Sequence, residues 1–179
     1  MSGPSSGGGH VVDLLRRLPG FRGYFEREER RDSDALLREH LAAELDRAKR
    51  PVEAVARSLA EAGQIGPLPR IDQLRGKLDR VIGRIRGAVR GYSGLFDARQ
   101  VDAALLEHVY QHDLTLVDQV AAFRTLVDGW AGQSPAVGQP AAVDAKLAEA
   151  EQALDRLDRA CDERGDLLKR LVANHPEAS

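Results

Sequence analysis

The sequence has few of the residues that cross-link or anchor a small protein. Its 179 residues include one cysteine, and only 4% are aromatic. The single cysteine, Cys161, excludes an internal disulfide framework and a cysteine-based zinc site, and it indicates a reducing compartment. The scarcity of aromatic residues argues against a β-sandwich or barrel, and the high content of Ala, Leu, Arg, Glu and Asp favours helices.

Long apolar runs and an excess of charge of one sign are also missing. No stretch of about 18 apolar residues occurs, so we expect no membrane-spanning helix. The first nine residues are rich in Gly and Ser and lack the basic start and apolar core of a signal peptide, so a cytoplasmic protein is predicted. A net charge of -2 argues against a general nucleic-acid binder, which would be basic.

Apolar residues recur every three or four positions through most of the chain, which is typical of amphipathic helices. Pro51 should kink or split the first long helix, and Gly63 should end it. Short connections favour antiparallel neighbours, so we predict an all-α fold, an elongated antiparallel four-helix bundle with coiled-coil character and a short N-terminal helix. The helices are expected at residues 11–18, about 26–62, 70–90, 98–130 and 142–173.

The same pattern divides the chain into segments. We predict that the last helix nearly keeps a strict heptad, which is typical of a coiled-coil seam, with Arg164 as the exception. The predicted organisation is a flexible tail over 1–10, a helical core over 11–130, a Pro/Gly linker over 131–141, the heptad helix over 142–173 and a tail over 174–179.

Charge is distributed unevenly between the helices. Residues 70–92 hold seven basic and two acidic residues, whereas residues 97–130 hold six acidic and two basic ones. We expect these two helices to form an antiparallel hairpin with complementary charges. The alternative is a peripheral site for phosphate-bearing surfaces, RNA or anionic lipid, with anion-binding candidates Lys77, Arg80 and Arg84.

Three glycines of the basic helix, Gly83, Gly87 and Gly91, share one face because they lie four residues apart. Glycine in a helix interior costs about 1 kcal/mol relative to alanine, so three glycines on one face indicate a structural role. We expect close approach of another helix, either within the bundle or from a second copy of the chain.

A histidine pair, His108 and His112, lies at i and i+4 beside Asp113, near the apolar stripe. One interpretation is a metal or small-ligand site at these three residues. The favoured interpretation is a buried polar cluster in which Asp113 has a cationic partner among the arginines of 27–38. Glu-x-x-His pairs, a Gly-rich phosphate loop and nucleophile motifs do not occur, so neither an enzyme nor a cofactor is predicted. Cys161 is expected to be a small buried hydrophobe.

Most of the few aromatic residues gather at two glycine-bearing turns. Exposed aromatic residues in loops often mark the binding site of a partner. The partner-binding candidates are Phe21, Tyr24, Phe25, Tyr92, Leu95 and Phe96.

The segments Leu18–Tyr24 and Glu28–Asp34, followed by the leucine stripe, resemble a family of bacterial all-helical proteins of uncharacterised function. In that family a Pro-Gly-aromatic-x-Gly-Tyr turn leads into a charged helix, and Gly91–Asp97 and Tyr110–Asp113 are similar to its later segments. The resemblance implies a helical fold and no activity. The predicted function is a non-enzymatic helical interaction or scaffold protein of the bacterial cytoplasm. A protein partner, and self-association above all, is expected; nucleic acid and anionic lipid are not favoured.

Overall fold

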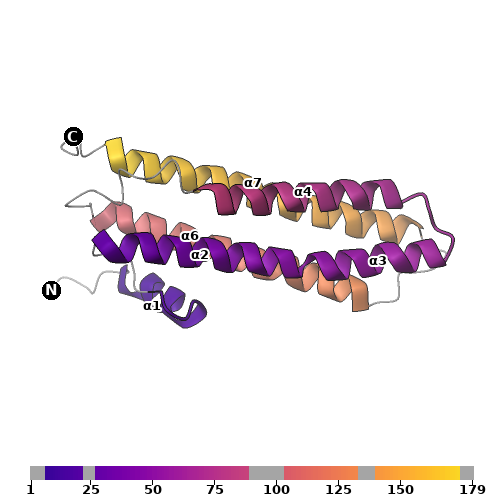
Figure 1. Ribbon diagram of the computed structural model, residues 1–179, viewed down its shortest axis with the longest axis horizontal. Coiled ribbons are helices and arrows are strands. Elements are labelled where there is room, and N and C mark those ends of the chain that lie inside the picture. The colour runs from indigo at the N-terminus through magenta and orange to yellow at the C-terminus, as the bar shows by residue number, and fades with distance from the viewer. Residues whose placement is uncertain (1–6, 22–26, 89–102, 133–139, 174–179) are drawn as a thin grey trace.

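The computed structural model describes residues 7–21, 27–88, 103–132 and 140–173, and this part of the chain is all-α (Figure 1). No strand occurs in these ranges, and no described helix combines the length and apolar character needed to cross a bilayer. The helices are α1 (Gly7–Arg17), α2 (Arg27–Arg47), α3 (Lys49–Glu61), α4 (Leu68–Gly87), α6 (Ala103–Gly132) and α7 (Pro140–Ala173).

The long helices form the predicted elongated four-helix bundle. Helices α2 and α3 follow one another along one edge, and α4, α6 and α7 complete the bundle (Figure 1). When α2 and α3 are counted as one rod, successive long helices run in opposite directions (Figure 1). The main contacts join α2 and α3 to both α4 and α6, and α7 to both α4 and α6. Helix α4 is therefore diagonal to α6, and its neighbour α7 runs parallel to it.

The predicted apolar stripes form one continuous core. Truncating a large side chain of this core would leave a cavity, and the change of a buried leucine to alanine costs about 2–5 kcal/mol. The buried stripe residues include Leu37, Leu41, Leu45, Val52, Val55 and Leu59 of α2 and α3, Ile71, Leu74, Leu78, Val81 and Ile85 of α4, Val109, Leu116, Val120, Phe123 and Val127 of α6, and Val143, Leu147, Ala150, Leu154, Leu157 and Leu168 of α7.

The first long helix is split, as the proline predicted. Helix α2 ends at Arg47 and α3 begins at Lys49, so Pro51 lies in the first turn of α3, where the missing N–H costs no helical hydrogen bond. Gly63 ends α3 in the left-handed region with φ of 71°. The Gly63 N–H donates to the carbonyl of Ala60 at 3.0 Å, and the Gln64 N–H donates to that of Leu59 at 2.8 Å, which together make a Schellman cap.

Helix α1 packs outside the bundle against α6. It begins at Gly7, so the helix takes up four residues of the tail expected over 1–10. Phe21, just after α1, is 2% exposed, and its ring meets the Tyr110 ring edge-on at a centroid distance of 6.4 Å. This corrects the expectation that Phe21 is a partner contact, because the core already covers it. Tyr24, Phe25, Tyr92, Leu95 and Phe96 lie outside the described residues.

The basic helix pairs with α7, so the predicted hairpin with the acidic helix is wrong. Arg70 Nη2 lies 2.9 Å from Glu151 Oε2, and Arg70 Nη1 lies 2.9 Å from Asp144 Oδ1. One heptad later, Lys77 forms an ion pair with Asp155. The cations of α4 meet carboxylates of α7 because the two helices run parallel and both repeats have a period of seven residues.

A second expectation for α4 concerned its glycines. Gly83 and Gly87 are exposed, and no heavy atom lies within 4 Å of the position that a Cβ would occupy at either residue. Close approach of a helix within the bundle at these two glycines is therefore wrong. Contact with a second copy of the chain stays a prediction, and Gly91 lies outside the described residues.

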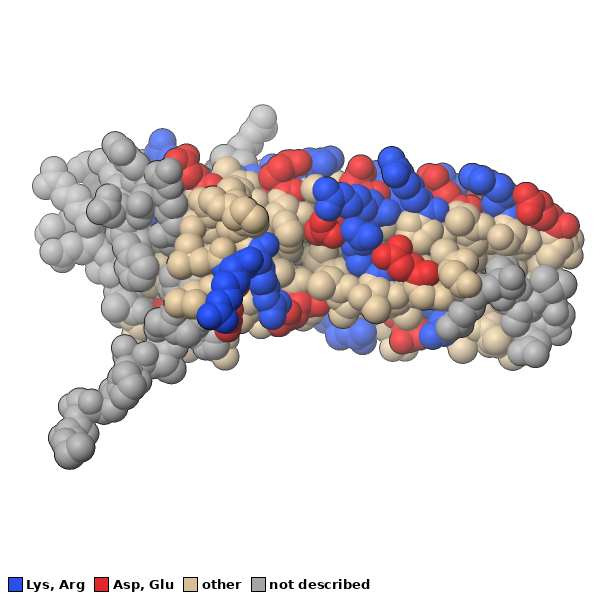
Figure 2. All heavy atoms as spheres, turned by 90° about the horizontal axis from the view of Figure 1, so that it is seen from below, with Lys and Arg blue, Asp and Glu red and all other residues tan. Residues whose placement is uncertain are grey.

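The described surface mixes charges of both signs. Figure 2 shows Lys and Arg side chains alternating with Asp and Glu along one face of the bundle. On α4, Lys77 and Arg84 are neutralised by α7, whereas Arg80 is exposed and has no ion-pair partner among the described residues.

The pairing of α4 with α7 predicts a specific energetic coupling. A double-mutant cycle of Arg70→Ala and Glu151→Ala should show a coupling free energy of about 0.2–1 kcal/mol, the range measured for exposed pairs. Urea denaturation measures it. The control cycle combines Arg70→Ala with Asp128→Ala, the acid that a hairpin of α4 with α6 would place near Arg70, and should show no coupling. Coupling in the control cycle alone would contradict the topology.

Candidate functional site

The candidate site lies at the end of the bundle where α4 stops short. Figure 1 shows that α2, α6 and α7 extend beyond the end of α4 at Gly87. The buried polar and charged residues of the described chain gather on these three helices: Arg30, Ser33, Asp34, Asp113 and Arg164. The buried polar side chains thus gather at one end of the bundle.

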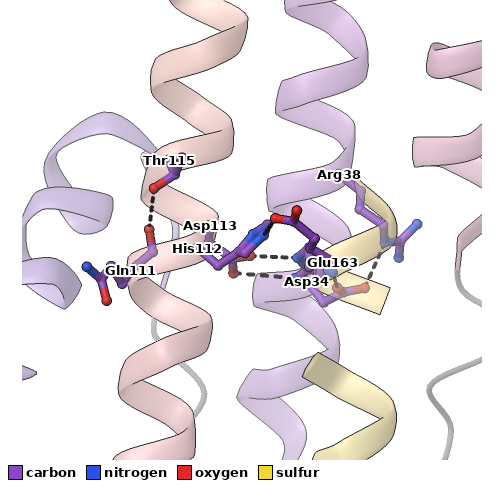
Figure 3. A network of polar contacts seen from close by, with 8 residues as sticks. Asp34, Arg38, Gln111, His112, Asp113, Thr115 and Glu163 are labelled. Atoms are coloured by element: carbon purple, nitrogen blue, oxygen red, sulfur yellow. Dashed lines mark hydrogen bonds and ion pairs between the residues drawn. The ribbon is translucent and has the colours of Figure 1, made fainter. Parts of the chain in front are cut away.

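The guanidinium of Arg164 joins three helices. Its Nε donates to Asp113 Oδ1 at 2.6 Å, and its Nη2 donates to Asp113 Oδ2 at 3.4 Å. Its Nη1 forms an ion pair with Asp34 Oδ1 at 2.9 Å. Asp113 is 0% exposed, and the Asp34 side chain is 2% exposed. Figure 3 shows Asp34 and Asp113 facing one another between α2 and α6. We call Asp34, Asp113 and Arg164 the ion cluster.

A second arginine extends the cluster toward the end of α4. Arg38 Nε donates to Asp34 Oδ2 at 2.7 Å, one helical turn away. Its Nη1 donates to the carbonyl of Arg86 at 3.3 Å. The last carbonyls of a helix have no partner within that helix and carry partial negative charge, so a cation is favourable there. Arg38 therefore fastens the end of α4 to α2.

One partner of Asp113 comes from outside the expected range. We predicted a cation from the arginines of 27–38, but Arg164 of α7 binds it. Arg164 is the exception in the heptad, so it occupies a core-facing position, where it reaches Asp113 across the bundle. Arg38 binds Asp34 on its own helix instead. The prediction of a satisfied polar cluster is confirmed for Asp113, and α7 supplies a cation that was not predicted.

The three residues of the expected metal site are not assembled as ligands. Asp113 is occupied by Arg164, and His108 is exposed. His112 Nε2 lies 3.6 Å from Glu163 Oε2, and its Nδ1 is buried without a hydrogen-bond partner (Figure 3). Within the described ranges, no group of three or more His, Cys, Asp or Glu side chains is arranged to hold a metal ion.

A pocket of about 480 Å³ adjoins the ion cluster at the end of α4. Its apolar lining comes from Leu41, Ile85 and Leu116, which belong to three different helices and are buried. Arg38 and Arg164 line it as well. The volume is in the range of small-molecule sites, which combine an apolar wall with a few polar groups.

The outer part of the pocket is charged. Arg84 and Lys169 line it together with Asp162 and Asp166. Arg84 pairs with Asp162 and with Asp158, and Lys169 Nζ lies 3.0 Å from Asp166 Oδ1. The cations at the mouth are therefore largely neutralised by neighbouring carboxylates of α7.

The only cysteine of the chain also lines this pocket. Burial raises the pKa of the Cys161 thiol from 9.0 to about 11, and Arg84 and Arg164 oppose that shift. The thiol is therefore protonated at neutral pH, which is the state of a packing residue and not that of a nucleophile.

Sequence reasoning missed Asp34, Arg38 and the pocket. The leucine stripe of α2, continued one turn toward its N-terminus, reaches Asp34 in front of Leu37 and Leu41. A carboxylate on a core-facing stripe and an arginine on a heptad seam are two signals of one buried ion pair. The pocket has no such signal, because it depends on where α4 ends relative to its neighbours.

Removing the shared cation should be strongly destabilising. Arg164→Met leaves two buried carboxylates short of their partner, so the free energy of unfolding should fall by about 3–5 kcal/mol in urea denaturation. The matched control, Arg159→Met on the exposed face of α7, should stay within about 0.5 kcal/mol of the parent. Adding Asp113→Leu to Arg164→Met should recover more than half of the loss, because Asp34 keeps Arg38. A loss equal to that of the control would rule out the cluster's role.

The thiol reactivity of Cys161 should follow its raised pKa. At neutral pH its alkylation should be about 100-fold slower than that of an unstructured cysteine, the factor that a rise from 9.0 to about 11 implies. The rate should climb about tenfold per pH unit until the pH approaches the pKa. Mass spectrometry of iodoacetamide-treated protein measures this rate, and urea-unfolded protein is the control. Equal rates in both would contradict the burial of the thiol.

No protein-family model, curated protein or solved structure matches the chain.

Proposed function

We propose that the chain is a non-catalytic helical bundle that binds a small anionic ligand in the pocket at the end of α4. The observation that carries this proposal is the guanidinium of Arg38, whose side chain is 12% exposed and lines the pocket. Two of its three nitrogens are used, Nε by Asp34 and Nη1 by the carbonyl of Arg86. Its Nη2 has no acceptor among the described residues.

A guanidinium with one free edge in a pocket favours an anion. Arginine presents its donors in a rigid fork that matches a carboxylate or phosphate, and such charge-assisted bonds are about twice as strong as neutral ones. In Figure 3 the Arg38 guanidinium reaches past Asp34 on the side away from Asp113. Because Asp34 and the end of α4 hold Arg38 in place, little side-chain freedom is lost when an anion binds.

The lining supports binding and gives no support to catalysis. Cys161 is held as a thiol by burial, and the carboxylates of Asp162 and Asp166 accompany the cations of the mouth. The earlier candidates for a phosphate-bearing surface are weakened, because Lys77 and Arg84 are paired with α7. Binding of one small anion in a pocket is thus better supported than binding of RNA or of a lipid surface.

Self-association, a scaffold role and a bacterial cytoplasmic location stay predictions. Val12 and Leu15, each 43% exposed, give α1 a small outward apolar face. Sedimentation velocity across a dilution series measures the oligomeric state, and we expect a dimer at micromolar concentration. A monomer throughout the series would end the self-association proposal and leave the ligand site untouched.

The anion site is tested by ligand protection of Cys161. Octanoate and inorganic phosphate are the probes, and at least one of them should slow thiol modification by methyl methanethiosulfonate at mildly alkaline pH. Arg38→Gln should reduce that protection about tenfold or more in apparent Kd, since it removes a charged hydrogen bond. Arg38→Lys should keep part of it.

The matched control for this experiment is Lys146→Gln. This residue lies near the start of α7, far along the bundle from the pocket, and pairs only with Glu149 in the described structure. It should leave protection unchanged. Circular dichroism verifies that each variant is folded. If neither probe protects the parent protein at millimolar concentration, the proposed function is wrong.

A further inference from the structure

We infer that the ligand of this pocket is a monoanionic amphiphile, a molecule with one carboxylate and an unbranched apolar tail. The inference rests on the proposed function and narrows it to one chemical class. It follows from the amount of positive charge that is free in the pocket, from the position of the apolar wall and from the volume.

The deep cations of the pocket leave room for one negative charge. Arg164 is used by Asp113 through two nitrogens and by Asp34 through the third. Arg38 is shared between Asp34 and the end of α4, so only its Nη2 edge is free of described acceptors. The two N–H groups of this one nitrogen can bind one carboxylate, and a second charge on the ligand would find no buried cation of its own.

The mouth discriminates against polyanions. Arg84 and Lys169 could attract further phosphate groups, but Asp158, Asp162 and Asp166 neutralise them. A ligand with several negative charges would lie near Asp162 and Asp166, which line the pocket, and like charges repel. Nucleotides, inorganic phosphate and citrate therefore fit the charge of this pocket less well than a single carboxylate does.

The apolar wall accounts for the tail. Leu41, Ile85 and Leu116 come from α2, α4 and α6, and each contributes aliphatic carbon to the lining of the pocket. Such a wall offers no partner to a polar group, but each ligand methylene that it removes from water makes the free energy of binding more favourable. A volume of about 480 Å³ exceeds what a carboxylate alone would occupy. The unused volume fits a medium-length alkyl chain.

The test is a homologous series of straight-chain carboxylates: butyrate, hexanoate, octanoate and decanoate. Isothermal titration calorimetry on the full chain measures Kd, and protection of Cys161 reports that the ligand is in the pocket. Each added methylene should tighten Kd about threefold to fourfold until the pocket is full. Octanol, octyl phosphate and inorganic phosphate serve as comparison ligands, and each should bind at least tenfold more weakly than octanoate.

The outcomes separate the two proposals. If inorganic phosphate protects Cys161 and carboxylate affinity does not depend on chain length, the inference is wrong while the proposed function stands. If octanol binds as well as octanoate, the anion requirement fails and both are wrong. If octyl phosphate binds best, the pocket accepts a dianion and the charge argument is overturned. If no probe protects Cys161, the proposed function itself is wrong.

The Arg38 variants separate recognition of the carboxylate from recognition of the alkyl tail. Arg38→Gln should bring the Kd of octanoate close to that of octanol, whereas its chain-length dependence should persist, because the apolar wall is intact. Arg38→Lys should retain most of the preference for octanoate over octanol. A variant that lost the chain-length dependence along with the anion preference would show that Arg38 acts on the shape of the pocket and not on the carboxylate.

Discussion

The bundle depends on one arginine placed where a hydrophobic residue would normally stand. Arg164 lies on the seam of α7 and binds Asp113 of α6 and Asp34 of α2 at a place where α4 no longer covers the core. Each of these charges would be costly to bury alone, and only their joint position makes burial tolerable. Their contribution is specificity: a slip of α7 by one heptad would separate Arg164 from both carboxylates, so the cluster fixes the register of three helices.

The ion pairs between the parallel helices α4 and α7 also fix the alignment of helices, in this case at the surface. A heptad of leucines is compatible with several registers, and exposed ion pairs are individually weak. Repeating them at Arg70, Lys77 and Arg84 gives one alignment in which each of these three cations meets an acid of α7. The inner cluster and the outer row of pairs select the same alignment, and the pocket is the space that this alignment leaves where α4 ends.

The fold was largely predictable from the sequence, because periodicity identifies helices and Pro51 and Gly63 mark their ends by simple stereochemistry. Helix pairing was not, since the acids of α6 and of α7 look equally suitable to a basic helix until the diagonal of the bundle is known. The buried cluster could be predicted only in part. Asp113 and Arg164 were recognisable as charged residues at core-facing positions, but nothing in the sequence indicates that these two residues, 51 positions apart, pair with one another. The pocket depends on differences in helix length at one end, which apolar patterns define only to within a few residues.

The order of synthesis gives Arg164 a further consequence. Both carboxylates of the cluster precede it in the chain, so they leave the ribosome before their cation exists. Until α7 docks, Asp34 and Asp113 lack the cation that α7 supplies, and the end of the bundle that later holds the pocket stays open. The last helix therefore closes the structure, and nascent chains that stop before it should stay partly open and depend on chaperones.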